Sequence, residues 1–164
     1  MSRGVPGKPL LDAELAAFIQ GGVSVVVATR NPDSVPDVAR GCGCRVSKDR
    51  RRVTVLVEPA RAGSALDNVV ANGLVAVVFS QPSTHRTIQL KGSDARVVRV
   101  TRADRTVALR HLEAWVAELT GMGYRPDFAR AVRGAADGMA AIAFTPTSAF
   151  QQTPGPGAGE RLGR

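Results

Sequence analysis

Three polar side chains alternate along one predicted strand, and their chemistry suits a planar heteroaromatic ligand. Thr87, Gln89 and Lys91 are spaced two residues apart, so they share one face of that strand. A hydroxyl, an amide and a cation on one face can hydrogen-bond the heteroatoms of such a ring. Arg86 precedes them, and two interpretations stay open: a solvated side chain, or a contact for a phosphate or for the ring. An apolar run over residues 75–79 leads into this segment and predicts a supporting strand.

A second cluster combines arginine with glycine. Arg40 and Arg45 flank a Gly-Cys-Gly-Cys segment. Glycine lets a ligand approach the backbone closely, and a guanidinium binds phosphate through two parallel hydrogen bonds. Because the two arginines are five residues apart, a regular strand places them on opposite faces. A bulge at Gly41 or Gly43 is needed to bring both to one site, and without it only the arginine that faces Gln89 belongs there.

Ser64 marks the predicted start of a helix. It stands three residues before Asp67, which is the spacing of a hydroxyl cap followed by an acid. The free N–H groups of a first helical turn attract anions. Ser64 and this helix end are therefore a candidate anion site.

The two cysteines, Cys42 and Cys44, are predicted to be small buried packing residues on one face of a strand. Redox and metal-binding roles stay open as alternatives. The two histidines, His85 and His111, have no partner ligand at a zinc-like spacing. We interpret His85 as a loop residue rather than a catalytic acid or base.

The sequence contains no GxGxxG, P-loop, GxSxG or HExxH motif. A bound cofactor is therefore expected to carry the chemistry if the protein is an enzyme. The net charge is +8, and arginines at residues 50–52 form the densest basic run, which we interpret as a solvated turn. Aromatic residues make up only 4% of the chain, so nucleic acid is an unlikely partner.

The apolar periodicity predicts a single domain that is mainly β with flanking helices. Strands are predicted over residues 23–29, 37–46, 53–57, 74–80, 87–100 and 139–144. Helices are predicted over residues 11–19, 64–72, 101–121 and 128–132. Thr101 and Asp104 repeat the spacing of a hydroxyl cap followed by an acid at the start of the longest helix. The face expected to be buried on the longest helix is Leu109, Leu112, Val116 and Leu119. Six strands joined mostly by short turns favour an antiparallel sheet closed into a small barrel.

Neither a membrane span nor a secretory signal is expected. No apolar run approaches the roughly 18 residues needed to cross a bilayer. Residues 1–9 lack an apolar core of the kind that a signal peptide carries. A cytoplasmic location is the resulting expectation.

Residues 11–152 resemble the pyridoxamine 5'-phosphate oxidase-like FMN-binding split barrels. The resemblance rests on the order of elements, the segment from Arg40 to Arg45, the helix that ends in Asn72-Gly73 and the segment over residues 86–92. It implies a six-stranded antiparallel split barrel over residues 1–152 with a flexible tail over 153–164. It also implies a homodimer that binds FMN at its interface and acts as an oxidoreductase on an unidentified small-molecule substrate.

The resemblance assigns roles to individual positions. Arg40 and Arg45 match an Arg-x-x-x-x-Lys strand that lines the flavin, with Arg45 in place of the lysine. Thr87 falls at a flavin-binding glutamine, with Gln89 two residues on. Phe150 stands at the tryptophan of a Phe-Trp-Gln segment. The cofactor-binding set is thus Arg40, Arg45, Ser64, Arg86, Thr87, Gln89, Lys91 and Phe150.

Two departures narrow the expected activity. An Arg-Lys pair that binds phosphate is missing near Ser64, so Ser64 and Arg61 would replace it. A substrate-binding Arg-x-His segment is absent after residue 152, and we do not expect pyridoxamine phosphate oxidation. The alternatives are a non-catalytic flavin-binding or sensing module and the same fold with deazaflavin or haem. Haem would need His85 or His111 as its axial ligand.

Overall fold

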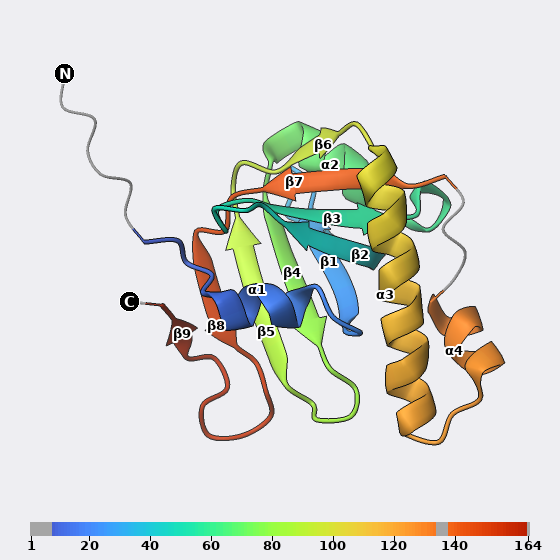
Figure 1. Cartoon of the computed structure of the whole chain (residues 1–164). Helices are drawn as coiled ribbons and strands as arrows, with labels where there is room; N and C mark the ends of the chain where they lie inside the picture. Colours follow the sequence, from blue (N-terminus) through green and yellow to red (C-terminus); the bar gives the residue numbers. More distant parts are fainter. Residues whose placement is uncertain (1–7, 134–137, 164) are drawn as a thin grey trace.

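The computed structural model describes residues 8–133 and 138–163. They form one antiparallel sheet with helices against it (Figure 1). The strand order is β6-β7-β3-β2-β1-β4-β5-β8-β9. The strands are β1 (Ser24–Arg30), β2 (Pro36–Val46), β3 (Val53–Val57), β4 (Val75–Ser80), β5 (Thr87–Gly92), β6 (Arg96–Val98), β7 (Ala140–Phe144), β8 (Ser148–Gln151) and β9 (Arg161–Leu162). The helices are α1 (Ala13–Ile19), α2 (Ala65–Asn72), α3 (Arg102–Gly121) and α4 (Pro126–Arg133), with a 3₁₀ turn over Pro59–Arg61.

The sheet twists strongly, so its two halves cross. In Figure 1, β1, β4, β5 and β8 run steeply, whereas β2, β3 and β7 cross them. The concave side encloses the main core, which contains Val25, Val27, Phe79, Leu90 and other apolar side chains. The helix α1 packs into this core through Ile19, and Figure 1 shows it lying across β5. The opposite side of β1, β4 and β5 therefore faces away from the core.

Several helices and strands begin or end at the residues that local sequence signals predict. The strand β3 covers the predicted residues 53–57. The helix α2 stops at Gly73, whose φ of 67° is left-handed, as the Asn-Gly signal predicts. At the start of α3, Thr101 and Asp104 form the predicted reciprocal capping box.

The buried face of α3 differs from the prediction. Leu109 is 60% exposed. The residues that face the protein are Asp104, Ala108, His111, Trp115 and Leu119. The reason is the close approach of α3 to β2: a Cβ added to Gly43 would lie 3.5 Å from the Cα of Ala108. Such a short separation between helix and strand requires small residues where leucines would otherwise be expected.

The mainly β class and the antiparallel arrangement are confirmed, but the described residues form nine strands in one open sheet, with β6 and β9 at its edges, rather than six strands closed into a barrel. The predicted strand over residues 87–100 divides into β5 and β6. Between them Ala95 donates its N–H to the Gly73 carbonyl at 3.0 Å, and Asp94 accepts the Thr145 N–H at 2.7 Å. These bonds turn the chain so that β6 pairs with β7 at the far edge of the sheet.

The residues after Gln152 fold back on the sheet. Arg161 and Leu162 form β9, which pairs with β8, and Leu162 packs against the main core. The predicted flexibility of this tail and the domain boundary at residue 152 stay predictions. In the described residues, no helix is long and apolar enough to span a membrane.

Candidate functional site

The side of the sheet that faces away from the core carries the best candidate site, and we call it the open face. It consists of the outward side chains of β2, β1, β4, β5 and β8. The burial pattern alternates along β1, β4 and β5, so every second residue points outward. The outward residues are Val38, Arg40, Ser24, Val26, Ala28, Arg30, Ala76, Val78, Ser80, Thr87, Gln89, Lys91, Ser148 and Phe150.

The strand register arranges these side chains in two rows across the open face. The first row reads Arg40, Val26, Val78, Gln89, Phe150. The second row reads Val38, Ala28, Ala76, Lys91, Ser148. The prediction that Thr87, Gln89 and Lys91 share a face is confirmed by their alternation with buried residues. Both rows have short apolar side chains at the centre, followed by a polar or cationic side chain on β5, Gln89 in the first row and Lys91 in the second.

This arrangement makes a shallow apolar platform with two cations beside it. The centre is built from valine and alanine, which leave room for a flat ligand. Lys91 is exposed, and its Nζ lies 5.0 Å from the centre of the Phe150 ring, a cation–π contact. Arg40 is exposed on the opposite side of the platform. A planar ring on this platform would meet the Gln89 amide and the Lys91 cation together.

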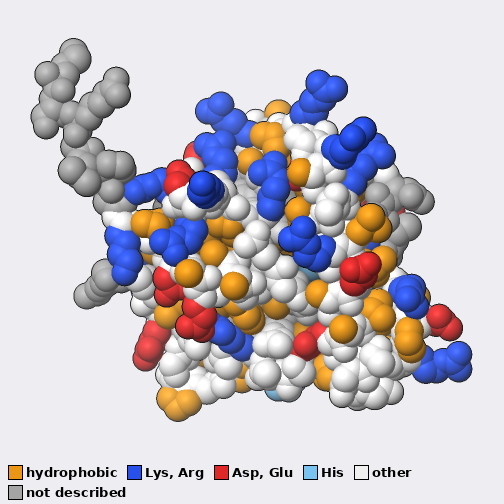
Figure 2. Space-filling model, viewed as in Figure 1, with side chains coloured by type: hydrophobic (Ala, Val, Ile, Leu, Met, Phe, Trp, Pro, Cys, Tyr) orange, Lys and Arg blue, Asp and Glu red, His pale blue; other side chains and the backbone are white. Residues whose placement is uncertain are grey.

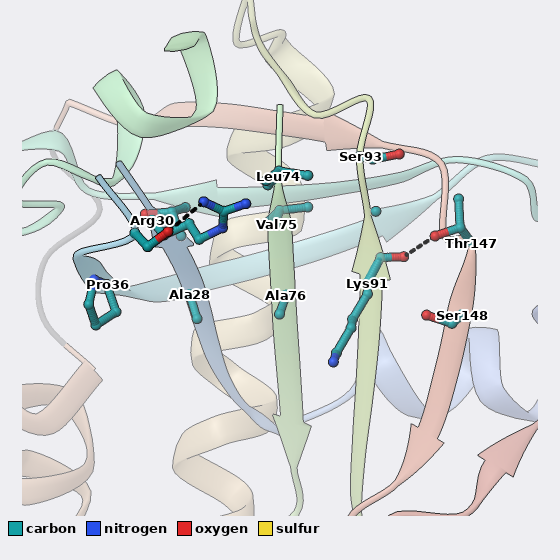
Figure 3. A pocket seen from close by; sticks show the side chains of 13 residues that line it. Ala28, Arg30, Pro36, Leu74, Val75, Ala76, Lys91, Ser93, Thr147 and Ser148 are labelled. Carbon is teal, nitrogen blue, oxygen red and sulfur yellow. Dashed lines mark hydrogen bonds between the residues drawn. The ribbon is translucent and has the colours of Figure 1, made fainter. Parts of the chain in front are cut away.

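A cavity of about 550 Å³ opens along the second row. Figure 3 shows Ala28, Ala76, Lys91 and Ser148 side by side across the strands at this cavity. At its rim, Arg30 donates to the Ser34 hydroxyl at 3.1 Å. Its volume falls in the range of small-molecule sites, about 300–1,000 Å³. The apolar floor and the few polar groups around it fit a small organic ligand.

The strand β2 contains a bulge between Gly41 and Gly43, which is the feature needed for Arg40 and Arg45 to lie on the same side of the sheet. Gly41 faces the core, where an added Cβ would lie 2.6 Å from the Val25 side chain. After the bulge the alternation shifts by one residue. Arg40 and Arg45 consequently both lie on the side away from the core. The helix α3 covers the Arg45 end of the strand, so only Arg40 reaches the open face.

The bulge also separates the two cysteines, which overturns the prediction that they share a face. Cys44 lies in the main core, whereas Cys42 packs with Leu56 and Ala108 in a second cluster under α3. Both are buried free thiols, as the packing interpretation predicts. Burial raises the pKa of the Cys42 thiol and that of the Cys44 thiol, so neither is a reactive thiolate at neutral pH.

Arg45 is part of a structural ion pair. Its Nε donates to Asp104 Oδ1 at 2.5 Å, and the Asp104 side chain is fully buried. Burial raises the pKa of the Asp104 carboxyl, but the hydrogen bonds from Arg45 and Thr101 outweigh that effect and the pKa is lowered. Arg45 therefore anchors the first turn of α3 to β2, and it lies apart from the open face.

Ser64 and Arg86 also lie away from the open face. The Ser64 hydroxyl makes no capping bond, and its N–H donates to Asp37 Oδ2 at 2.6 Å. Arg86 pairs with Glu14 at 2.8 Å, and its guanidinium lies 4.4 Å from the centre of the Phe18 ring. Arg86 thus holds the loop before β5 against α1, on the core side of the sheet.

Thr87 remains on the open face but is engaged locally. Its Oγ1 lies 2.7 Å from the Ser80 hydroxyl and donates to the His85 carbonyl at 2.9 Å. His85 is an exposed loop residue with a left-handed φ of 59°. The Thr87 hydroxyl is therefore less available to a ligand than the side chains of Gln89 and Lys91.

His111 lies on the buried side of α3. Its Nε2 is 2.8 Å from the Val23 carbonyl oxygen, and the ring is buried. Burial lowers the pKa of His111, so the imidazole is neutral at pH 7. Neither histidine lies on the open face. In residues 8–133 and 138–163, no group of three or more His, Cys, Asp or Glu side chains is placed to hold a metal ion.

Several residues that line the cavity were not predicted from the sequence. They are Arg30, Ser34, Ser93, Thr147 and Ser148. The available signal was the pair of alanines, Ala28 and Ala76, within valine-rich strands. Small residues at outward positions of neighbouring strands leave space above the sheet. Their pairing depends on register, which hydrophobic alternation alone does not provide.

The basic side chains are also unevenly spread over the surface. Figure 2 shows Lys and Arg side chains gathered over the upper part of the molecule, where Figure 1 places β3, β6 and β7. Arg96 and Arg99 are exposed in this region. The second row of the open face is viewed in Figure 3, with α3 behind the sheet. That nucleic acid is an unlikely partner stays a prediction.

Comparison with known proteins identifies the fold. No protein-family model matches the chain, and no curated protein matches its sequence. Among solved structures, HupZ of Group A Streptococcus superposes with a TM-score of 0.56 at 16% identity, over 91% of this chain and 99% of that one. A candidate pyridoxamine 5'-phosphate oxidase of Lactobacillus delbrueckii gives 0.52 at 16% identity, over 89% and 97%. An F420 reductase gives 0.50 at 19% identity, over 88% and 98%.

These likenesses cover nearly the whole of each chain, so the match is to one complete fold. They confirm the predicted resemblance to the pyridoxamine 5'-phosphate oxidase-like split barrels at the level of fold. These neighbours are named for different functions, and their sequence identities to this chain are below 20%. The shared fold therefore does not identify the ligand of this chain, which has to be inferred from its own residues.

Proposed function

We propose that the protein is a flavoprotein that binds FMN on the open face and acts as an oxidoreductase on a small substrate. The observation that carries this proposal is the platform of Val26, Ala28, Ala76 and Val78 beside Gln89 and Lys91. A flat heteroaromatic ring matches an apolar floor of short side chains. The amide and the cation match its hydrogen-bonding edge. The residues present therefore fit the ring of a flavin.

When bound, the flavin would supply hydride transfer at its N5 position. The chain would supply binding and electrostatics. The Lys91 cation would favour negative charge on the edge of the ring that it meets, and Gln89 would orient that edge. Arg40 would attract an anionic group at the other side of the platform. The apolar floor would keep water from the covered face of the ring.

The proposed assembly is a homodimer with the cofactor at its interface. Exposed apolar residues lie beside the platform on β2 and the turn before it: Val35 is 58% exposed and Val38 is 59% exposed. A second copy of the chain would cover them and would close the platform from above. Sedimentation equilibrium tests this assembly. A monomer at all protein concentrations, with FMN present, would rule it out.

Two further candidates use the same face. A deazaflavin shares the ring shape that the platform fits, and one structural neighbour is named as an F420 reductase. A binding or sensing module without turnover is favoured by the side chains of the open face, which include no carboxylate and no imidazole. Such a site has no evident general acid or base.

An absorption spectrum of the freshly purified protein tests the proposal, with the released ligand identified by mass after heating. The expected result is a two-band yellow spectrum and released FMN. A deazaflavin in the released fraction would select the second candidate, and an intense Soret band would indicate haem. A colourless protein that also fails to bind added FMN would refute the proposal.

A further inference from the structure

The cavity on the open face extends past the ring platform to one end of β1 and β4. Arg30 stands two residues after Ala28 on β1, and Leu74 stands two residues before Ala76, just ahead of β4. Both line the cavity, and Figure 3 shows both of them above the two alanines. A flat ring over Ala28 and Ala76 would therefore leave the Arg30 end of the cavity open to a second molecule.

The charged side chains that line this cavity are all positive. Among the described residues, its lining contains the cations Arg30 and Lys91 and no carboxylate. Neither cation forms an ion pair within residues 8–133 and 138–163, whereas Arg45 and Arg86 are each paired with an acid. The other polar side chains of the lining are serines and threonines. Such a lining favours a ligand that carries negative charge.

The turn after β1 holds the Arg30 guanidinium at the rim of the cavity. The Asn31 carbonyl accepts the Ser34 N–H at 3.0 Å, and Asn31 Oδ1 accepts the Val35 N–H at 2.9 Å. Ser34 has a left-handed φ of 65°, which is uncommon for residues other than glycine. In this conformation its Oγ accepts a hydrogen bond from Arg30 Nη1 at 3.1 Å. Because a hydroxyl both accepts and donates, Ser34 can also donate to a ligand that Arg30 binds.

The backbone of Arg30 is fixed as well. Arg30 pairs with Pro36 where β1 meets β2, and its carbonyl accepts a hydrogen bond from Asn72 Nδ2 at 2.8 Å. The base of the side chain is thus anchored to β2 and to the end of α2, while the side chain itself is exposed. A guanidinium that is held at both its base and its tip loses little freedom when it binds an anion.

We propose that the Arg30 end of the cavity binds the carboxylate of a small organic acid, and that such an acid is the substrate class of the protein. The remaining N–H groups of the guanidinium match the two oxygens of a carboxylate, and the Ser34 hydroxyl adds a further donor. Leu74 would contact the apolar body of the acid. The assignment as a substrate rests on the proposed function, because a ring on the platform would then lie next to the bound acid.

Benzoate and benzamide test the proposal, because they have nearly the same flat shape and differ in charge. Binding of each to the full chain without added flavin is followed by NMR through the amide signals of Ser34 and Leu74. The wild-type protein should bind benzoate about tenfold more tightly than benzamide. Arg30→Gln should abolish this preference, since the amide keeps a donor for Ser34 but carries no charge. Arg96→Gln is the matched control: it removes an exposed strand arginine outside the cavity and should leave the preference unchanged.

Equal affinities of the wild-type protein for benzoate and benzamide would overturn the proposal. An unchanged preference in Arg30→Gln would do the same, and its loss in Lys91→Gln instead would assign the carboxylate to Lys91. If Arg30→Gln fails to fold, Arg30→Lys replaces it. This variant keeps the charge without the planar fork, so the preference should fall to about threefold. An unchanged preference in the folded Arg30→Lys variant would also count against Arg30.

Titrations with FMN and riboflavin separate a substrate carboxylate from the phosphate of a flavin, because these two ligands differ only in the phosphate. Arg30→Gln should leave the ratio of their affinities unchanged. A loss confined to FMN would assign Arg30 to the flavin phosphate and overturn its role toward a substrate.

The same measurements distinguish this inference from the proposed function. If the wild-type protein binds neither flavin but prefers benzoate through Arg30, the proposed function fails and the carboxylate site stands. If it binds FMN but does not distinguish benzoate from benzamide, the proposed function stands and the carboxylate site fails.

Discussion

Arg40 and Arg45 lie on the same strand and on the same side of the sheet, yet they belong to regions of opposite character. Beyond the bulge, α3 covers β2, and Arg45 is paired with the buried Asp104. Before the bulge, the sheet is bare, and Arg40 is exposed with no ion pair among the described residues. The first region holds helix and sheet together, and the second leaves its charge available to a ligand.

Other buried polar side chains in the region covered by α3 are also engaged in hydrogen bonds to the protein. The buried Arg133 donates to the carbonyls of Cys42 and Ala108 at 2.6 and 2.7 Å. The buried His111 meets the Val23 carbonyl. The comparison teaches that residue type alone does not identify a binding residue in this fold. What matters is whether a helix covers that part of the sheet.

The largest expected effect lies in the covered region. Arg133→Met should lower the free energy of unfolding by about 2–4 kcal/mol, because it removes two buried hydrogen bonds that the guanidinium donates to the Cys42 and Ala108 carbonyls. Urea denaturation measures the change. Arg130→Met is the control on the exposed side of α4 and should cost under about 0.5 kcal/mol. Equal effects for the two variants would show that the covered region does not depend on Arg133.

The next effect belongs to the open face. Lys91→Ala should weaken FMN binding about tenfold, or about 1.4 kcal/mol, because it removes the only cation of the second row. Fluorescence titration measures this change. Lys48→Ala removes an exposed lysine from a turn outside the open face and should leave the affinity unchanged. A smaller loss for Lys91→Ala than for Lys48→Ala would exclude Lys91 from the site.

A smaller effect, dependent on pH, is expected at the ion pair. Arg45→Ala should cost about 1 kcal/mol at pH 7, a modest value because the arginine side chain is partly exposed. The lowered pKa of Asp104 means that its contribution is present above the ordinary carboxyl pKa of about 3.9 and is lost as pH falls through the folded-state pKa.

Denaturation of the wild-type protein and Arg45→Ala from pH 7 to pH 2 therefore gives a difference that shrinks toward acid. A difference that stays constant, or that grows toward acid, would contradict the assignment of the ion pair. The same series with Arg102→Ala provides the control, because Arg102 is an exposed residue of the same helix turn.

The smallest effect concerns stability at the open face. Arg40→Ala and Lys91→Ala should each change the free energy of unfolding by under about 0.5 kcal/mol, since both side chains are exposed. Urea denaturation without ligand checks this. A loss near that of Arg133→Met would mean that the open face is structural and would remove the contrast between the two regions.

Local signals in the sequence account for much of the fold. The apolar run of β3, the capping box of Thr101 and Asp104 and the glycine stop after α2 depend on residues that are close in sequence, and their predictions are confirmed. The alternation in β5 likewise predicts the shared face of Gln89 and Lys91. These features are set by backbone propensity and local hydrogen bonds.

The remaining features depend on contacts between distant segments. The division of β5 from β6 requires Asp94 to accept the Thr145 N–H, and no local pattern reports that bond. The buried face of α3 follows from its close approach to Gly43, which favours Ala108 over Leu109. The sequence predicts that Arg45 joins the site only if β2 contains a bulge, and the bulge is present. Arg45 is nevertheless covered by α3, and the sequence of β2 does not show that a helix packs there.

The most direct test of this account is to map the FMN-binding face by NMR. Amide signals of the chain are followed during an FMN titration. The account predicts that the largest shifts fall on Val26, Ala28, Ala76, Gln89 and Lys91, while Arg45 and the α3 residues stay nearly unchanged. Shifts concentrated on α3 and the second half of β2, with none across the open face, would contradict it.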